Sequence, residues 1–103
     1  MNHVLVGTIE EFPVGEQKVI EIEGEYVLVV HSISGFWAIE DRCSHDDNEL
    51  FGGEVEGKTI KCSRHGAKFD LETGAALSMP AVRGVRSYQV LVEDGQVWVQ
   101  TRD

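Results

Sequence analysis

Apolar and polar residues alternate along most of this chain with a period of two, and this pattern limits the possible folds more than any other feature. No window of useful length carries apolar residues at the three- and four-residue spacing of an amphipathic helix. A period of two is typical of strands that bury one face and expose the other. The alternation predicts strands at residues 4–9, 18–22, 26–31, 36–40, 59–62, 67–70, 85–92 and 96–101.

Turn signals separate these segments. Acidic or small polar residues precede glycine at Glu23-Gly24, Ser34-Gly35, Glu56-Gly57, Thr73-Gly74 and Asp94-Gly95. Glycine supplies the positive φ angles that tight hairpins need. A helical turn is expected only at 9–12, where Pro13 limits its length. Short strands at regular spacing predict an all-β fold, a small antiparallel sandwich or barrel.

The length of 103 residues suits a single domain over 1–103 with a modest core and no need for disulfide bonds. No segment approaches the roughly 18 apolar residues of a membrane span. The N-terminus has neither a basic flank nor a long apolar run, so we expect no signal peptide and no membrane partner. These features predict a cytoplasmic location with reduced thiols.

The formal net charge is −9, and the negative charge is concentrated toward the N-terminus. Residues 1–41 hold eight acids and one base, whereas residues 42–90 hold seven of each and are neutral. This acidic balance argues against nucleic-acid binding through a basic surface. The neutral stretch is either ordinary solvated surface or a less acidic face at which a redox partner docks.

Each of the chain's two cysteines is followed closely by a histidine. Cys43 and His45 form a C-x-H motif, and Cys62 and His65 form a C-x-x-H motif after an interval of sixteen residues. Two loops of this kind that face each other offer two thiolates and two imidazoles to one site. This ligand set suits zinc or iron–sulfur chemistry, whereas calcium and magnesium prefer oxygen ligands.

The alternatives for the two cysteines are buried free thiols, a disulfide and a structural zinc site. A disulfide requires an oxidising compartment, which nothing in the sequence indicates, and it leaves the paired histidines unexplained. Common zinc patterns take two cysteines from one loop and two histidines from another, whereas both loops here are mixed. A mixed loop suits a binuclear cluster, because its cysteine can bind one iron and its histidine the other. His3 and His31 have no such cysteine neighbour and are expected to be ordinary strand residues.

On these motifs the chain resembles Rieske-type ferredoxins, in which a C-x-H motif is followed at a similar interval by C-x-x-H. The resemblance extends to Leu50, Gly53, His65-Gly66, Phe69-Asp70, Thr73-Gly74, Pro80-Ala81 and the hairpin over 88–99. In clusters of this class two histidines replace two cysteines on one iron. The resemblance implies one [2Fe–2S] cluster per chain, with Cys43 and Cys62 on the inner iron and His45 and His65 on the outer iron. It also implies a cluster-binding part over approximately 41–82, with a third loop around Pro80 that covers the cluster.

Two departures from the respiratory branch of this family bear on the reduction potential. A disulfide across the cluster is absent, because the chain has no third or fourth cysteine. Ala67 and Phe69 occupy the positions that match the Ser and Tyr hydroxyls near the cluster sulfurs in those proteins. Hydrogen bonds to sulfur stabilise the reduced cluster, so their loss predicts a low potential, roughly −150 to 0 mV.

The resemblance implies a one-electron carrier that passes electrons from a ferredoxin reductase to a terminal oxygenase. No phosphate-binding loop for a flavin or nicotinamide is visible, so no catalytic residues are predicted. Docking is expected to be transient, at the face that exposes the histidines, and the carrier is expected to be a monomer. The alternatives are the small subunit of a nitrite-reductase-like complex, an accessory protein of iron–sulfur assembly or redox sensing, and a structural zinc module.

Overall fold

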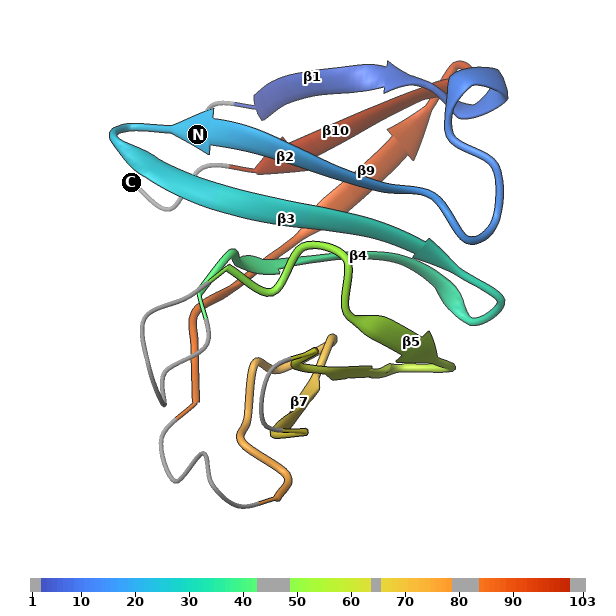
Figure 1. The fold of residues 1–103 in the computed structure, drawn as a ribbon. Helices are drawn as coiled ribbons and strands as arrows, with labels where there is room; N and C mark the ends of the chain where they lie inside the picture. The colour runs from blue at the N-terminus through green and yellow to red at the C-terminus, as the bar shows by residue number, and fades with distance from the viewer. Residues whose placement is uncertain (1–2, 43–48, 64–65, 79–83, 101–103) are drawn as a thin grey trace.

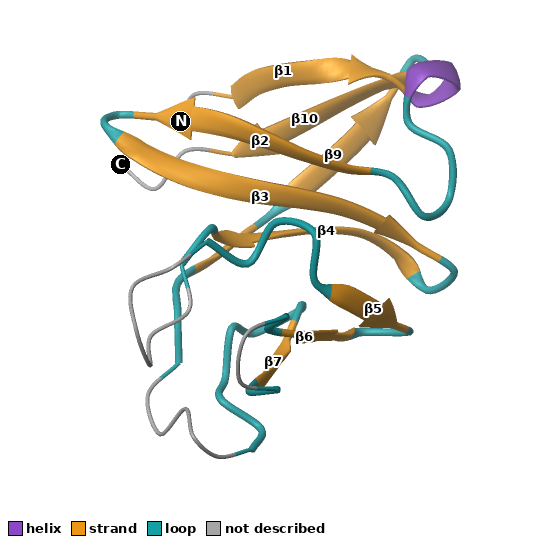
Figure 2. Cartoon of the chain, in the orientation of Figure 1, coloured by secondary structure: helices purple, strands orange, loops and turns teal. Residues whose placement is uncertain are grey.

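The computed structural model describes residues 3–42, 49–63, 66–78 and 84–100, and in these residues the regular secondary structure is β-strand apart from one short 3-10 turn (Figures 1 and 2). The predicted all-β antiparallel fold is confirmed. The strands are β1 (His3–Thr8), β2 (Gln17–Ile22), β3 (Glu25–Ser32), β4 (Gly35–Glu40), β5 (Glu54–Glu56), β6 (Thr59–Lys61), β7 (Lys68–Asp70), β8 (Ser87–Tyr88), β9 (Val90–Glu93) and β10 (Gln96–Gln100). A 3-10 turn, η1 (Ile9–Glu11), lies where the sequence predicted a helical turn.

These strands form three antiparallel sheets arranged in layers (Figure 1). The first has the order β1-β10-β9, the second β2-β3-β4-β8 and the third β5-β6-β7. Figure 1 shows the sheet of β2, β3 and β4 between the other two. We call these the outer sheet, the middle sheet and the small sheet. The described part of the chain contains no helix with the length and apolar character that a membrane span requires.

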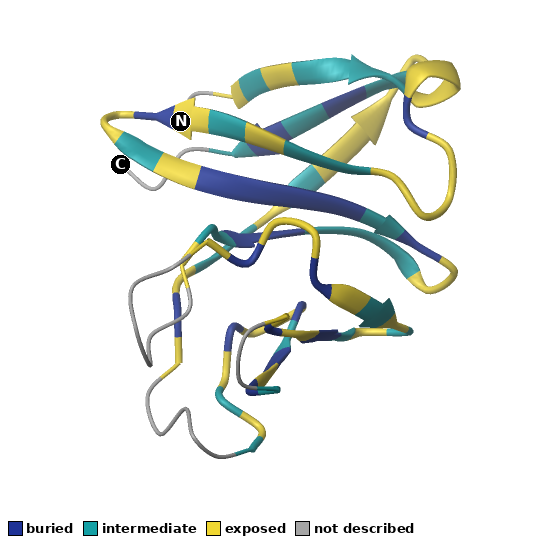
Figure 3. Cartoon of the chain, viewed as in Figure 1, coloured by how far each residue is buried: buried dark blue, intermediate teal, exposed yellow. Residues whose placement is uncertain are grey.

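The middle sheet separates two hydrophobic cores. Val27 and Val29 of β3 belong to the core against the outer sheet, and Leu28 and Val30 belong to the core against the small sheet. All four are buried, because β3 is covered on both of its faces (Figure 3). Cys62 lies in the second of these cores. The small sheet and the site beside it are therefore anchored on the apolar underside of the middle sheet.

The prediction of one strand over 85–92 was wrong. Ser87 and Tyr88 pair with β4 in the middle sheet, whereas Val90–Glu93 pairs with β10 in the outer sheet. Gln89 lies between the two strands, and its carbonyl oxygen accepts a hydrogen bond from the N–H of Gln100 at 2.9 Å. The chain thus changes sheets without a break in its apolar alternation, which explains why the sequence pattern did not separate the strands.

Strand β5 has no signal in the sequence. Its Glu-Val-Glu segment carries a single apolar residue, and it forms a strand because it pairs with β6 in the small sheet. The 3-10 turn η1, in contrast, has a local cause. The Thr8 hydroxyl accepts a hydrogen bond from the N–H of Glu11 at 3.3 Å, and the Glu11 carboxylate accepts one from the N–H of Thr8 at 3.1 Å. This reciprocal pair is a capping box.

Candidate metal centre

Cys62 follows β6 directly, and 1% of its surface is exposed. Its N–H donates a hydrogen bond to the carbonyl oxygen of Ala67 at 2.7 Å, and the N–H of Gly66 donates to the carbonyl oxygen of Cys62 at 3.0 Å. These bonds join the two ends of the segment that carries the C-x-x-H motif. The small sheet therefore holds Cys62 in a defined place at the exit of β6.

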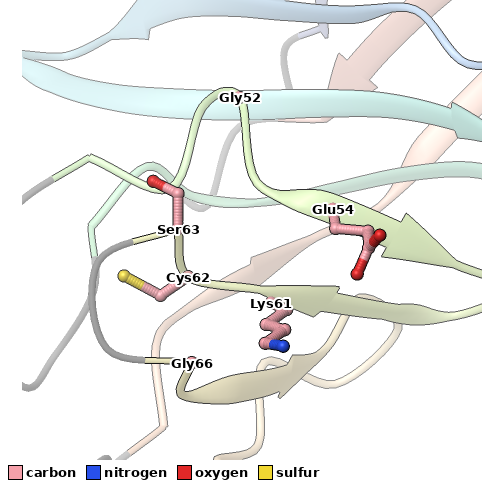
Figure 4. A pocket seen from close by; sticks show the side chains of 6 residues that line it. All are labelled: Gly52, Glu54, Lys61, Cys62, Ser63 and Gly66. Atoms are coloured by element: carbon pink, nitrogen blue, oxygen red, sulfur yellow. The ribbon is translucent and has the colours of Figure 1, made fainter.

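A cavity of about 470 Å³ lies at Cys62. Figure 4 shows the residues that line it: Gly52, Glu54, Lys61, Cys62, Ser63 and Gly66. Cys62 lines this cavity, and its thiolate is the type of ligand that zinc and iron–sulfur clusters take. The other predicted ligands, Cys43, His45 and His65, lie outside the described residues. Within the described part of the chain, no group of three or more His, Cys, Asp or Glu side chains is placed to hold a metal ion.

Asp41 closes the base of the segment that carries the C-x-H motif. Its Oδ1 accepts hydrogen bonds from the N–H groups of Leu50 and Phe51, both at 2.9 Å. Its own N–H donates to the carbonyl oxygen of Tyr26 at 2.9 Å. Burial raises the pKa of Asp41, and the hydrogen bonds from Phe51 and Leu50 act in the opposite direction. Asp41 thus ties the residues after the first motif to the middle sheet.

The side chain of Gln17 in β2 binds the backbone of Gly52 and Gly53, the two residues after Phe51. Its side-chain oxygen accepts a hydrogen bond from the N–H of Gly52 at 2.7 Å, and its side-chain nitrogen donates to the carbonyl oxygen of Gly53 at 2.9 Å. Gly53 has no room for a side chain, because an added Cβ would lie 2.4 Å from the carbonyl oxygen of Lys61. The turn over 50–53 therefore packs directly against the residue before Cys62.

Glu40 joins the residue before the C-x-H motif to the residues after the segment around Pro80. Glu40, at the end of β4, accepts a hydrogen bond from the N–H of Arg86 at 3.1 Å and lies 3.3 Å from the guanidinium of Arg42. Its own N–H donates to the carbonyl oxygen of Arg86 at 2.8 Å. Arg42 precedes the C-x-H motif, and Arg86 follows the segment around Pro80. Pro80 itself, expected to belong to a covering loop, lies outside the described residues.

Gly74 and Gly84, which lie before and after the segment around Pro80, bring the two sides of that segment together. The carbonyl oxygen of Gly74 accepts a hydrogen bond from the N–H of Val85 at 2.8 Å. An added Cβ at Gly74 would lie 2.0 Å from the carbonyl oxygen of Val85, and one at Gly84 would lie 2.6 Å from the carbonyl oxygen of Gly74. Glycine is therefore required at both positions for the two backbones to approach this closely.

Ala67 and Phe69 are fully buried and pack in the same core as Cys62. Neither carries a hydroxyl, so neither can donate a side-chain hydrogen bond to a sulfur atom at this site. His3 and His31 lie in strands, as expected. The ring of His31 stacks on Phe36 with a centroid separation of 3.8 Å, and its Nδ1 lies 2.6 Å from the carbonyl oxygen of Phe12.

Asp41, Gln17 and Glu40 were not predicted from the sequence. Each side chain forms hydrogen bonds mainly with backbone N–H and carbonyl groups. Almost every residue has these groups, so the sequence does not show which residues are the partners. The available signals were weak. Asp41 lies two residues before a cysteine of the ligand pattern, and Gln17 is a polar residue at the start of an alternating strand.

Comparison with known families decides what kind of protein this is. The model of the Rieske [2Fe-2S] domain matches residues 2–89. The chain belongs to the Rieske [2Fe–2S] family. Members of this family carry a [2Fe–2S] cluster, so the buried thiol and its cavity belong to an iron–sulfur protein and not to a zinc protein.

The similarity to individual Rieske proteins spans most of this chain and most of each relative. The 3-phenylpropionate/cinnamic acid dioxygenase ferredoxin subunit of Photorhabdus laumondii is 36% identical over 96% of this chain and 94% of its own length. The ferredoxin of carbazole 1,9a-dioxygenase from Nocardioides aromaticivorans IC177 is 30% identical and superposes with a TM-score of 0.91, over 99% of this chain and all of that one. A further solved structure, a complex of reduced oxygenase and oxidized ferredoxin in carbazole 1,9a-dioxygenase, matches over 94% of this chain and 91% of that chain, with 28% identity and a TM-score of 0.86.

Proposed function

We propose that this Rieske protein is a one-electron carrier, the ferredoxin component of a dioxygenase-type system. The main support is that its similarity to a dioxygenase ferredoxin subunit spans 96% of this chain and 94% of the relative. The similarity thus covers nearly the full length of the relative. The bound cluster would supply reversible one-electron transfer, and the role of the chain is to hold it and present it to partners. This makes the protein an electron-transfer component rather than a catalytic one.

The proposed cluster ligands are Cys43 and Cys62 on the inner iron, and His45 and His65 on the outer iron. The buried thiol of Cys62 at the cavity wall supports its part of this assignment. The cluster-binding part is proposed to span approximately 41–82 within a single domain over 1–103. Asp41, whose carboxylate closes the base of the first ligand segment, lies at the proposed start of that part.

The proposed carrier works at low potential. Ala67 and Phe69 are fully buried beside Cys62 and cannot donate side-chain hydrogen bonds to the cluster sulfurs. A reduced cluster gains stability from such bonds, so their absence favours the low end of the class range of about −150 to +300 mV. A redox titration of the purified protein measures this directly. A midpoint above about +150 mV, in the upper half of that range, would contradict the assignment.

The proposed partners are a ferredoxin reductase, which reduces the carrier, and a terminal oxygenase, which oxidises it. A solved complex of oxygenase and ferredoxin, to which this chain is similar, supports the second partner. The carrier is proposed to act as a cytoplasmic monomer that docks transiently. No feature of the chain favours a nitrite-reductase small subunit or an assembly protein, so neither is proposed.

Two measurements test the function. Low-temperature EPR of the dithionite-reduced protein should give the signal of one reduced [2Fe–2S] cluster per chain, whereas a zinc protein would be colourless and silent. The reduced protein should then support turnover of the 3-phenylpropionate/cinnamic acid dioxygenase when it replaces that system's own ferredoxin subunit. Reduced protein that transfers no electrons, in an assay where that ferredoxin subunit does, would contradict the proposal.

A further inference from the structure

The turn over 50–53 contributes Gly52 to the wall of the cavity at Cys62, and its backbone is bound by the side chains of Gln17 in β2 and of Asp41, which follows β4. The turn has a single hydrogen bond of its own, from the N–H of Gly53 to the carbonyl oxygen of Leu50 at 2.9 Å. Asp41 and Gln17 bind its remaining N–H groups, those of Leu50, Phe51 and Gly52. Every backbone N–H of these four residues is therefore paired.

This wall is in close contact with the end of β6, the strand that Cys62 follows. Gly52 lines the same cavity as Cys62 (Figure 4), and the Cα of Gly53 lies so near the carbonyl oxygen of Lys61 that no side chain would fit. Leu50 is buried in the core that contains Cys62. A displacement of the turn would therefore expose Cys62, of whose surface only 1% is now accessible, to water on this side.

We propose that Asp41 and Gln17 are positioning residues that fix this wall, and that they thereby control how tightly the protein retains its cluster and how far water reaches it. The inference rests on the proposed role of Cys62 as a cluster ligand. Asp41 holds the first two residues of the turn, and Gln17 holds the last two. Both side chains act through the backbone of the turn and not on the cluster itself.

Asp41 is tested by a pair of variants. Asp41→Ala removes the acceptor of two N–H groups, whereas Asp41→Asn keeps an oxygen in the same position. In the alanine variant, we expect hydrogen exchange by mass spectrometry to show faster exchange of the amides of Leu50 and Phe51. We also expect the cluster absorbance to decay at least about tenfold faster in the presence of an iron chelator, because two hydrogen bonds are lost. The asparagine variant should restore both values toward those of the wild-type protein.

Gln17 is tested against a matched change in another sheet. Gln17→Leu removes both bonds to Gly52 and Gly53, whereas Gln96→Leu makes the same chemical change on β10 of the outer sheet. We expect Gln17→Leu alone to accelerate loss of the cluster. It should also raise the midpoint potential, because water admitted beside Cys62 stabilises the more negative reduced cluster. Equal effects of the two leucine variants would overturn the proposal for Gln17.

A third variant separates this inference from the ligand assignment. Cys62→Ser should yield protein without the normal cluster spectrum. If Cys62→Ser retains that spectrum, the ligand assignment and the proposed role of the wall both fail. If the serine variant loses it, while Asp41→Ala and Gln17→Leu keep wild-type release rates and potentials, only the role of the wall is overturned.

Discussion

The close approach of Gly74 and Gly84 allows a stability prediction in which backbone strain and steric crowding are measured separately. Gly74 has a φ of +81°, and an added Cβ would lie 2.0 Å from the carbonyl oxygen of Val85. Gly57 has a φ of +61° with no atom within 4 Å of its Cβ position. An added Cβ at Gly84 would lie 2.6 Å from the carbonyl oxygen of Gly74, but the φ of Gly84 lies outside the left-handed region. The three alanine variants thus isolate strain, crowding and their sum.

The expected magnitudes follow from these distances. A non-glycine residue in the left-handed region costs about 1–2 kcal/mol, which is the whole effect expected of Gly57→Ala. Crowding against a backbone that cannot move freely costs about 1–3 kcal/mol, which is the effect expected of Gly84→Ala. Gly74→Ala combines both, so we expect it to reduce the stability by about 2–5 kcal/mol. A loss of that size is a large share of the stability of a small domain.

Stability is best compared as the rate of unfolding at one urea concentration, because release of the cluster makes unfolding irreversible. Far-UV circular dichroism follows the loss of the sheets, and visible absorbance follows the cluster. We expect the rates to rise in the order Gly57→Ala, Gly84→Ala, Gly74→Ala. If Gly74→Ala unfolds no faster than Gly57→Ala, the backbones near residue 74 can separate at little cost, and the reasoning from the close approach is refuted.

Four further predictions concern the site and the fold. Ala67→Ser places a hydroxyl at a fully buried position beside Cys62 and should raise the midpoint potential in a redox titration; an unchanged midpoint would argue against the role of the missing donor. Thr8→Ala removes the cap of η1, a contact of the kind that contributes about 1 kcal/mol, and should raise the rate of unfolding at one urea concentration. The hydrogen bond from the N–H of Thr8 lowers the pKa of Glu11, so its contribution should be present at neutral pH and lost as the pH falls through that lowered value; equal effects of Glu11→Gln at neutral and acidic pH would contradict this. Lys58→Gln breaks an exposed ion pair with Glu72 and should leave the unfolding rate nearly unchanged, and a large acceleration would show that the pair matters more than its exposure suggests.

The apolar alternation was sufficient to predict the fold class and most strands. It failed where pairing depended on distant partners. β5 has one apolar residue and exists because β6 lies beside it, and Gln89 marks a change of sheet that leaves the alternation intact. In strand β3, by contrast, the residues do not alternate. Val27–Val30 forms an uninterrupted apolar run because both faces of the strand are covered. The ends of the elements and their assignment to sheets are thus decided by tertiary contacts.

The candidate site was predictable only in its chemistry. Cysteine and histidine have distinctive side chains, so their spacing indicated an iron–sulfur site, and the structure places Cys62 buried at a cavity. The positions of Cys43, His45 and His65 as ligands stay predictions, since these residues lie outside the described part of the chain. Asp41 and Gln17 could not be found in the same way. Their partners are main-chain groups of a turn that is near them only in the folded protein.

Because the middle sheet is buried on both faces, this protein cannot easily be shortened to fewer strands. Removal of the small sheet and its loops would uncover Leu28, Val30 and Ile39, which now face that layer. A continuous apolar surface of this kind on a truncated chain promotes self-association. The outer and middle sheets alone would therefore make a poor stand-alone scaffold. Redesign for another redox centre should exchange side chains within the small sheet and keep its backbone in place.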